Sequence, residues 1–108
     1  MSTSKAAPVA RMVAVVVLSV SPVQADSAAR VSAGETIYGD YCSSCHGEGL
    51  KNTSGGVTFD LRRLRPEDRD RFFSSVLEGK RQMPPWRGVL DTEQIESIWT
   101  YVRAKLDQ

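Results

Sequence analysis

The stretch Tyr41-Cys42-Ser43-Ser44-Cys45-His46-Gly47 contains both cysteines and the single histidine of this 108-residue chain. The two cysteines are three positions apart, and the histidine follows the second one directly. Side chains three positions apart lie on the same face of a helix, so both thiols can reach one edge of a flat ligand. The imidazole at the next position would then lie beneath that ligand. This spacing therefore allows the two thiols and the imidazole to contact one flat ligand.

The C-x-x-C-H spacing is typical of covalent haem c attachment. Cys42 and Cys45 are the predicted thioether positions, and His46 is the predicted proximal ligand of the haem iron. A disulfide between the two thiols would close a short loop and constrain the unfolded chain little. A redox-active thiol pair usually lies in a thioredoxin-like βαβ unit, and the sequence shows no such pattern. A zinc site needs four ligands, whereas the chain offers only two cysteines and one histidine. We therefore predict one covalently bound haem c per chain, with a non-haem thiol oxidoreductase as an alternative.

The composition fits one small globular domain, with 41% hydrophobic and 25% charged residues. The 14 basic and 13 acidic side chains nearly cancel, and no long run carries one sign of charge. A nucleic-acid-binding protein needs a concentrated basic surface, so the sequence gives no support to that class.

The first 25 residues have the three-part layout of a secretory signal peptide. Lys5 and Arg11 precede the apolar run MVAVVVLSV at 12–20, and Val23-Gln24-Ala25 is a small-x-Ala cleavage site. A membrane anchor is the alternative, but the charge-free window 12–25 is shorter than the roughly 20 apolar residues of a spanning helix. We predict export to the periplasm and cleavage after Ala25, which leaves residues 26–108 as one domain without a membrane span. A domain this small commonly needs a cofactor to complete its core.

Two helices are predicted on either side of a glycine-rich segment. Ser32 and Glu35 fit a capping box for a helix from Ala33 to about Ser44, with Ile37, Tyr38 and Tyr41 on its apolar face. The segment 47–60 contains four glycines and is predicted to be an irregular loop. Pro66 suits the first position of a second helix, and Gly79 suits the position after its last turn.

A third helix is predicted after Asp91, which suits the N-cap, with Gln94 three residues on. No run alternates long enough between apolar and polar residues to build a sheet. The predicted fold class is therefore all-α, with three main helices and long loops around the haem. The apolar residues of the third helix recur at helical spacing: Ile95, Ile98, Trp99, Val102 and Leu106.

The second axial ligand separates an electron carrier from a haem protein that binds small molecules. A second histidine is not available within the chain, and Met1 and Met12 lie in the predicted signal peptide. Met83 remains, in the run Gln82-Met83-Pro84-Pro85-Trp86, where two prolines stiffen the loop. We predict Met83 as the distal ligand, because a thioether favours ferrous iron and raises the reduction potential. A core-filling role is the alternative use of a methionine.

With these residues, the mature chain resembles the class I c-type cytochromes over essentially its whole length. Gly34, Tyr38 and the C-x-x-C-H motif at 42–46 have the spacing of that family's first helix. Ile98 and Tyr101 look like the apolar and aromatic pair of its last helix. The resemblance implies a class I cytochrome c fold in which Gly34 lies at the crossing of the first and last helices.

The loop sequences resemble a narrower group. Met83 with Pro84 matches the family's axial-ligand loop, and the runs at 58–62 and 82–86 are similar to small bacterial cytochromes that serve quinoprotein alcohol dehydrogenases. The resemblance implies a PQQ-dependent alcohol dehydrogenase as the electron donor. A downstream cytochrome or a terminal oxidase would then be the acceptor.

Several other side chains are candidates for contacts around the haem. Trp86 can donate its indole N–H to a haem propionate, or simply pack on the porphyrin. Arg62 can form a charge-assisted bond to a propionate, although such charges commonly form a solvated face. Lys80, Arg81 and Arg87 flank Met83 and would attract an acidic redox partner.

The sequence therefore predicts a soluble, monomeric, monohaem cytochrome c that carries one electron between periplasmic redox partners and catalyses no reaction. The alternative function is a haem enzyme or gas sensor, which requires an open or labile sixth position on the iron. A stable bond from Met83 argues against that alternative.

Overall fold

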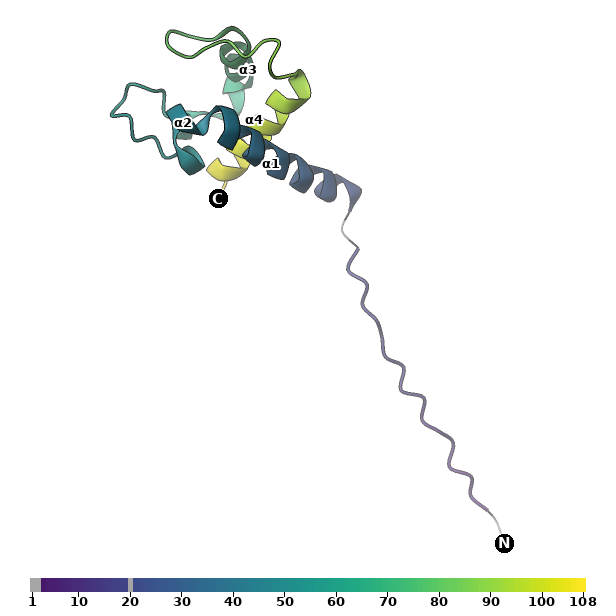
Figure 1. Ribbon diagram of the computed structural model, residues 1–108. Coiled ribbons are helices and arrows are strands. Elements are labelled where there is room, and N and C mark those ends of the chain that lie inside the picture. Colours follow the sequence, from purple (N-terminus) through teal and green to yellow (C-terminus); the bar gives the residue numbers. More distant parts are fainter. Residues whose placement is uncertain (1–2, 20) are drawn as a thin grey trace.

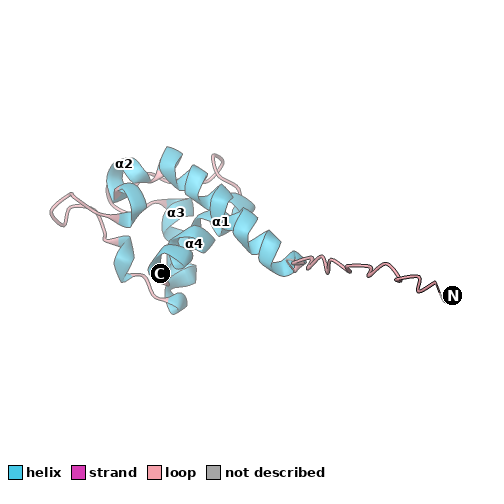
Figure 2. Ribbon diagram, turned by 90° about the horizontal axis from the view of Figure 1, so that it is seen from below, coloured by secondary structure: helices cyan, strands magenta, loops and turns pink. Residues whose placement is uncertain are grey.

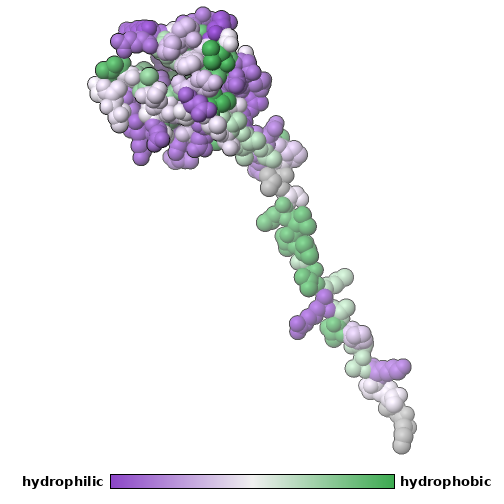
Figure 3. Space-filling view, viewed as in Figure 1, coloured by the Kyte–Doolittle hydropathy of each residue, from purple (hydrophilic) through white to green (hydrophobic). Residues whose placement is uncertain are grey.

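The computed structural model describes residues 3–19 and 21–108 of the chain. Met1 and Val20, which belong to the predicted signal peptide, lie outside the described residues. Residues 3–19 form neither helix nor strand and extend away from the helical part (Figures 1 and 2). Figure 3 shows that apolar side chains are concentrated along this segment, whereas the visible face of the helical part is mostly polar. No helix within 3–19 and 21–108 is both long and apolar enough to span a membrane.

The first helix, α1, spans Pro22–Tyr41 and begins well before the predicted start. The hydroxyl of Ser21 accepts a hydrogen bond from the backbone N–H of Gln24, 3.3 Å away, and Pro22 occupies the first turn. A serine N-cap followed by proline is a strong start signal, so the helix begins there. The predicted cleavage point after Ala25 lies within this helix, and cleavage stays a prediction.

The predicted capping box at Ser32 and Glu35 is therefore wrong, because both residues lie inside α1. The Ser32 carbonyl accepts a hydrogen bond from the Thr36 hydroxyl at 3.3 Å, as a mid-helix residue does. The helix also ends earlier than predicted, at Tyr41, and a separate one-turn helix, α2, covers Ser43–His46. Two 3-10 turns, η1 at Glu48–Leu50 and η2 at Leu61–Arg63, lie on either side of the intervening loop.

The second predicted helix is split at its start and ends where expected. Pro66 begins a 3-10 turn, η3, at Pro66–Asp68, and the helix α3 follows at Arg69–Glu78. Gly79 follows its last turn with φ 73°, a left-handed conformation that favours glycine. Phe72 and Val76 are the buried residues of α3.

The third predicted helix is confirmed with its cap. Helix α4 spans Thr92–Leu106. The Gln94 backbone N–H donates to the Asp91 carboxylate at 2.8 Å, and the Asp91 N–H donates to the Gln94 side-chain oxygen at 2.9 Å. This reciprocal pair satisfies two backbone donors at the start of the helix. Its buried residues are Ile95, Ile98, Trp99, Tyr101 and Val102.

Helices α1 and α4 pack against each other (Figure 2). Gly34 of α1 lies in this contact, against Ser97 and Tyr101 of α4. A β-carbon at Gly34 would overlap the Ser97 carbonyl oxygen and lie 2.9 Å from Cβ of Tyr101. Only glycine fits, which confirms the crossing implied by the resemblance. The Tyr38 ring extends the contact and packs on Tyr101, with ring centroids 5.3 Å apart. The described residues form no strand beyond two isolated bridges, so the all-α prediction is confirmed.

Candidate functional site

The histidine of the motif is oriented by a backbone carbonyl. His46 ends α2, and its Nδ1 lies 3.1 Å from the Phe59 carbonyl oxygen. Because a carbonyl only accepts, Nδ1 carries the proton in this hydrogen bond, and Nε2 keeps its lone pair for a metal. Burial of the ring lowers the pKa of His46, and the hydrogen bond to Phe59 partly opposes this shift. Burial thus favours the neutral imidazole, which is the form that binds iron.

The segment that presents this carbonyl is held by its own polar side chains. The Asn52 amide donates to the Thr58 carbonyl oxygen at 2.5 Å, and the Asn52 side-chain oxygen accepts from the Ser54 N–H at 2.8 Å. The Thr58 N–H in turn donates to the Ser54 hydroxyl at 3.0 Å. This network fixes the backbone one residue before Phe59. The sequence analysis missed it, although an Asn two residues before a Ser is a known turn signal.

The two thiols are free. Cys42 is half-buried beside the apolar core, and Cys45 is exposed. Burial raises the pKa of the Cys42 thiol to about 11, and the neighbouring Cys45 adds to the shift. A thiol oxidoreductase needs a cysteine whose pKa is lowered, so that the reactive thiolate forms at neutral pH. The environment of Cys42 has the opposite effect and disfavours that alternative.

Met83 lies in a tight turn that folds back on Gly79. The Lys80 N–H donates to the Met83 carbonyl oxygen at 3.1 Å, and the Met83 N–H donates to the Lys80 carbonyl oxygen at 3.0 Å. A β-carbon at Gly79 would lie 2.6 Å from the Met83 carbonyl oxygen. The turn therefore requires glycine at this position, and the Met83 side chain packs partly buried against the core.

The Met83 loop, defined as residues 79–90, is docked on the end of α3. The Trp86 N–H donates to the Val76 carbonyl oxygen at 2.8 Å, and the Arg87 N–H donates to the Leu77 carbonyl oxygen at 3.2 Å. The Trp86 ring meets the Tyr41 ring edge to face, with centroids 5.3 Å apart and an angle of 76°. Tyr41 directly precedes Cys42. The fold therefore brings the Met83 loop next to the C-x-x-C-H motif.

Two arginines that the sequence analysis assigned to the surroundings of the haem, Arg62 and Arg87, are paired with carboxylates. The Arg62 guanidinium binds Asp60 through two hydrogen bonds, of 3.0 and 2.9 Å, and Arg87 pairs with Glu78. A contact from Arg62 to a haem propionate stays a prediction, and it would have to compete with Asp60. Lys80 and Arg81 are exposed and form no salt bridge within residues 3–19 and 21–108.

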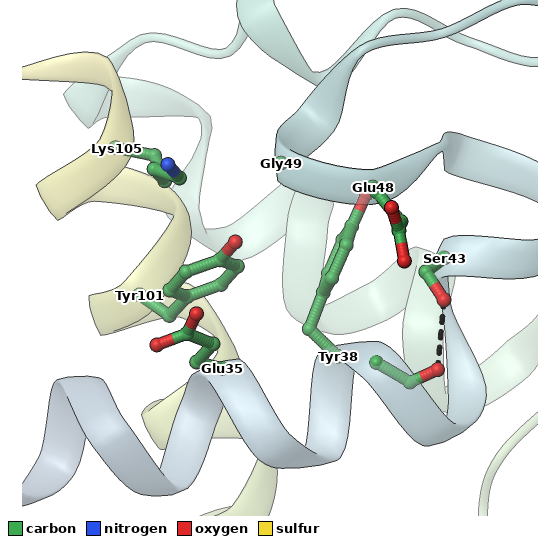
Figure 4. A pocket seen from close by; sticks show the side chains of 8 residues that line it. Glu35, Tyr38, Ser43, Glu48, Gly49, Tyr101 and Lys105 are labelled. Carbon is green, nitrogen blue, oxygen red and sulfur yellow. Dashed lines mark hydrogen bonds between the residues drawn. The ribbon is translucent and has the colours of Figure 1, made fainter.

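An open pocket of about 380 Å³ lies between α1, α4 and η1 (Figure 4). None of the predicted haem-site residues lines it. Glu35, Glu48 and Lys105 at its edges give mixed charge, and Figure 4 shows the Tyr101 hydroxyl directed toward its interior. The pocket is therefore distinct from the group formed by the thiols, His46 and Met83.

The side chains of Cys42, Cys45, His46 and Met83 together fit haem c. They offer two thiols that form no disulfide, an imidazole with one nitrogen held by a carbonyl, and a thioether on a docked loop. Tyr41 is 38% exposed and Phe59 is 47% exposed, although both belong to the segments that carry or support this group. A flat apolar cofactor would cover such side chains.

Comparisons with known proteins point the same way. The profile of the family described as cytochrome C oxidase, cbb3-type, subunit III matches residues 29–102. Cytochrome c6 of Nostoc sp. is 32% identical, over 68% of this chain and 69% of the relative. Cytochrome c6 of Leptolyngbya boryana is 29% identical, over 74% of this chain and 98% of the relative. Quinohemoprotein alcohol dehydrogenase ADH-IIG of Pseudomonas putida is 35% identical over 75% of this chain. The solved structure of ADHIIG from Pseudomonas putida HK5 matches 74% of this chain, with a TM-score of 0.64 and 32% identity.

The helical fold and these matches define a class I cytochrome c domain. The chain belongs to the cytochrome c family, which implies haem c as its cofactor. The likeness to the dehydrogenases concerns one part of them, because the chain spans 11% of the length of ADH-IIG and 12% of the solved ADHIIG chain.

Proposed function

We propose that the protein is a periplasmic one-electron carrier in which Cys42 and Cys45 hold haem c by thioether bonds, and His46 and Met83 are the axial ligands. The observation that carries the proposal is the 3.1 Å hydrogen bond from His46 Nδ1 to the Phe59 carbonyl, beside two free thiols. This bond directs Nε2 away from the backbone as the available ligand atom. Bound haem c supplies an iron that alternates between the ferrous and ferric states.

The protein's own residues tune and protect that iron. The thioether of Met83 is a soft donor that favours the reduced state and raises the potential. The Phe59 carbonyl makes His46 a more basic ligand. Met83 and Cys42 pack against the same apolar core, which shields both side chains partly from water.

We propose a quinoprotein alcohol dehydrogenase as the electron donor and a downstream cytochrome or terminal oxidase as the acceptor. The likeness to a segment of ADH-IIG supports this choice of donor. Lys80 and Arg81, exposed on the Met83 loop, would attract an acidic surface of either partner. The signal-peptide pattern in residues 1–25 supports export and cleavage after Ala25. We expect a monomer, because a carrier docks only briefly with each partner.

The covalent attachment is tested by haem staining on a denaturing gel, since only a thioether-linked haem remains with the chain. The protein should be produced together with a haem-attachment system. We expect a haem-stained band for the wild-type chain and for the control Ser44→Ala, which changes the motif without removing a thiol. The double variant Cys42→Ala, Cys45→Ala should lose the stain and fold poorly. An unstained wild-type band would refute covalent attachment.

The alternative function, a haem enzyme or gas sensor, requires a labile bond from Met83. Addition of carbon monoxide to the ferrous protein separates the two functions, because carbon monoxide binds only when the sixth position is open. The docking of the Met83 loop on α3 favours a stable bond and therefore the electron carrier.

A further inference from the structure

An aromatic pair joins the Met83 loop to the thiol-bearing segment, beside the apolar core that both segments share. Tyr41 is the last residue of α1 and the residue before Cys42, and Trp86 lies three residues after Met83. Their rings meet edge to face, with centroids 5.3 Å apart. Aromatic pairs favour this geometry, because the positive edge of one ring meets the negative face of the other.

The hydrogen bonds of the Met83 loop lie within the loop or join it to α3. Lys80 and Met83 bond to each other, and the Trp86 and Arg87 N–H groups bond to carbonyls at the end of α3. The Arg87 side chain also pairs with Glu78 of α3. Within the described part of the chain, no hydrogen bond or salt bridge joins residues 79–90 to α1 or α2. These bonds fix the loop on α3 but do not fix its distance from the thiols.

We propose that Tyr41 is a positioning residue for the sixth ligand: its ring holds Trp86 and thereby holds the Met83 thioether over the haem side of the thiol-bearing helix. The inference rests on the proposed ligation by His46 and Met83. The thiols and His46 fix one side of the haem to α1 and α2. Met83 binds the iron well only if its loop keeps a fixed distance from those helices, and the Tyr41 ring supplies the aromatic contact nearest to the thiols.

The ring of Tyr41, rather than its hydroxyl, makes this contact. The Tyr41 hydroxyl has no hydrogen bond within the described residues, whereas the Tyr38 hydroxyl donates to the Gly47 carbonyl at 2.6 Å. Phenylalanine at position 41 therefore keeps the contact, and leucine removes the edge-to-face pair. Tyr41 is half-exposed at a helix end, so neither substitution empties the core.

The test compares haem-loaded Tyr41→Phe and Tyr41→Leu with the wild-type protein. Free imidazole competes with Met83 for ferric iron, so its affinity reports how firmly the thioether is held. We expect Tyr41→Leu to bind imidazole about three- to tenfold more tightly, the range that follows from the strength of an aromatic pair. Tyr41→Phe should stay within about twofold of the wild type on the same principle. The haem stain and the far-UV circular dichroism should not change in either variant.

A double-mutant cycle isolates the pair from general effects on the loop. Trp86→Leu should raise the imidazole affinity as Tyr41→Leu does, and the double variant should add little beyond either single change. The proposal is overturned if Tyr41→Leu binds imidazole no more tightly than the wild type, if Tyr41→Phe binds it as tightly as Tyr41→Leu, or if the effects of Tyr41→Leu and Trp86→Leu simply add.

The failure of the proposed ligation gives a different result. Thioether-ligated ferric haem has a weak red charge-transfer band, and the wild-type protein should show it. If the wild-type band is absent, Met83 is not the ligand, and both the ligation and the role of Tyr41 are refuted. If the band is present and Tyr41→Leu leaves it and the imidazole affinity unchanged, only the role of Tyr41 is refuted.

Discussion

The loops beside His46 and Met83 begin alike and are held differently. Gly47 follows α2 with φ 86°, and Gly79 follows α3 with φ 73°. In each loop the backbone turns back onto the glycine. A β-carbon at Gly47 would overlap the Lys51 carbonyl oxygen, and one at Gly79 would lie 2.6 Å from the Met83 carbonyl oxygen. Both sides of the site thus depend on a glycine that terminates a helix.

Beyond these glycines the two loops have little in common. The His46 side is held by hydrogen bonds among its own side chains, with Asn52 at the centre. The Met83 side is held by backbone bonds to α3 and by the ring of Tyr41. The proximal side is therefore held by residues close to His46 in the sequence, whereas the distal side also depends on Tyr41, which lies far from the Met83 loop in the sequence. We expect Met83 to leave the iron before His46 when the protein is mildly destabilised.

The largest effects are expected at the two glycines. A left-handed alanine costs about 1 to 2 kcal/mol, and a steric clash adds to that cost. Gly55 has φ 67° with no atom near its missing β-carbon, so Gly55→Ala measures the conformational cost alone. Denaturant unfolding of the haem-loaded proteins should give a loss of stability in the order Gly47→Ala, Gly79→Ala, Gly55→Ala. Equal losses in all three would show that the close approaches do not matter.

Substitution of Met83, the proposed distal ligand, should change the distal side of the site and leave the proximal side intact. Met83→Ala opens the sixth position, so the ferrous protein should bind carbon monoxide and the reduction potential should fall. The haem stain should remain, because Cys42, Cys45 and His46 are untouched. Gln82→Ala, one residue earlier and exposed, is the matched control and should behave as the wild type. A Met83→Ala protein that excludes carbon monoxide would identify another distal ligand.

The proximal side is tested at Asn52. Asn52→Ala removes the hydrogen bonds to Thr58 and Ser54, which should cost about 1 to 3 kcal/mol of stability. The looser Phe59 carbonyl should shift the reduction potential modestly and leave the thioether band of the ferric protein unchanged. Thr53→Ala, at an exposed neighbour outside the network, is the control. If the two variants gave the same potential, the network would have no role in orienting His46.

The smallest effect on the protein itself is expected from surface charge. The double variant Lys80→Gln, Arg81→Gln should slow reduction by an acidic partner at low salt and flatten the dependence of that rate on ionic strength. Lys51→Gln removes an exposed charge on the His46 side and should change neither property. An equal effect of both changes would place the docking surface elsewhere or spread it over the whole molecule.

The sequence predicted the features that rest on local chemistry. The cap at Asp91 and the helix end at Gly79 were predictable, because each depends on a few adjacent residues. The start of α1 was not, because Ser21-Pro22 and Ser32-x-x-Glu35 both fit a helix start and the alanine-rich segment between them favours helix. The ion pairs of Arg62 with Asp60 and of Arg87 with Glu78 were not predicted either, because they depend on where the backbone turns.

The contacts around the site were harder to predict. Tyr41 was assigned to an apolar face, but the end of α1 leaves it half-exposed beside Trp86, 45 positions further along the chain. No periodicity links residues that far apart. Cys42, Cys45, His46 and Met83 were identified because their chemistry is visible in the sequence, and their roles as haem ligands stay predictions.

The central claim is that a stable sixth ligand makes this protein an electron carrier. It is tested most directly by the visible spectrum of the haem-loaded mature protein, ferric and then ferrous, before and after addition of carbon monoxide. We predict a c-type ferrous spectrum that carbon monoxide does not change, because the proposed ligands His46 and Met83 would occupy both axial positions. A ferrous spectrum that carbon monoxide shifts would contradict the claim and favour gas binding or catalysis.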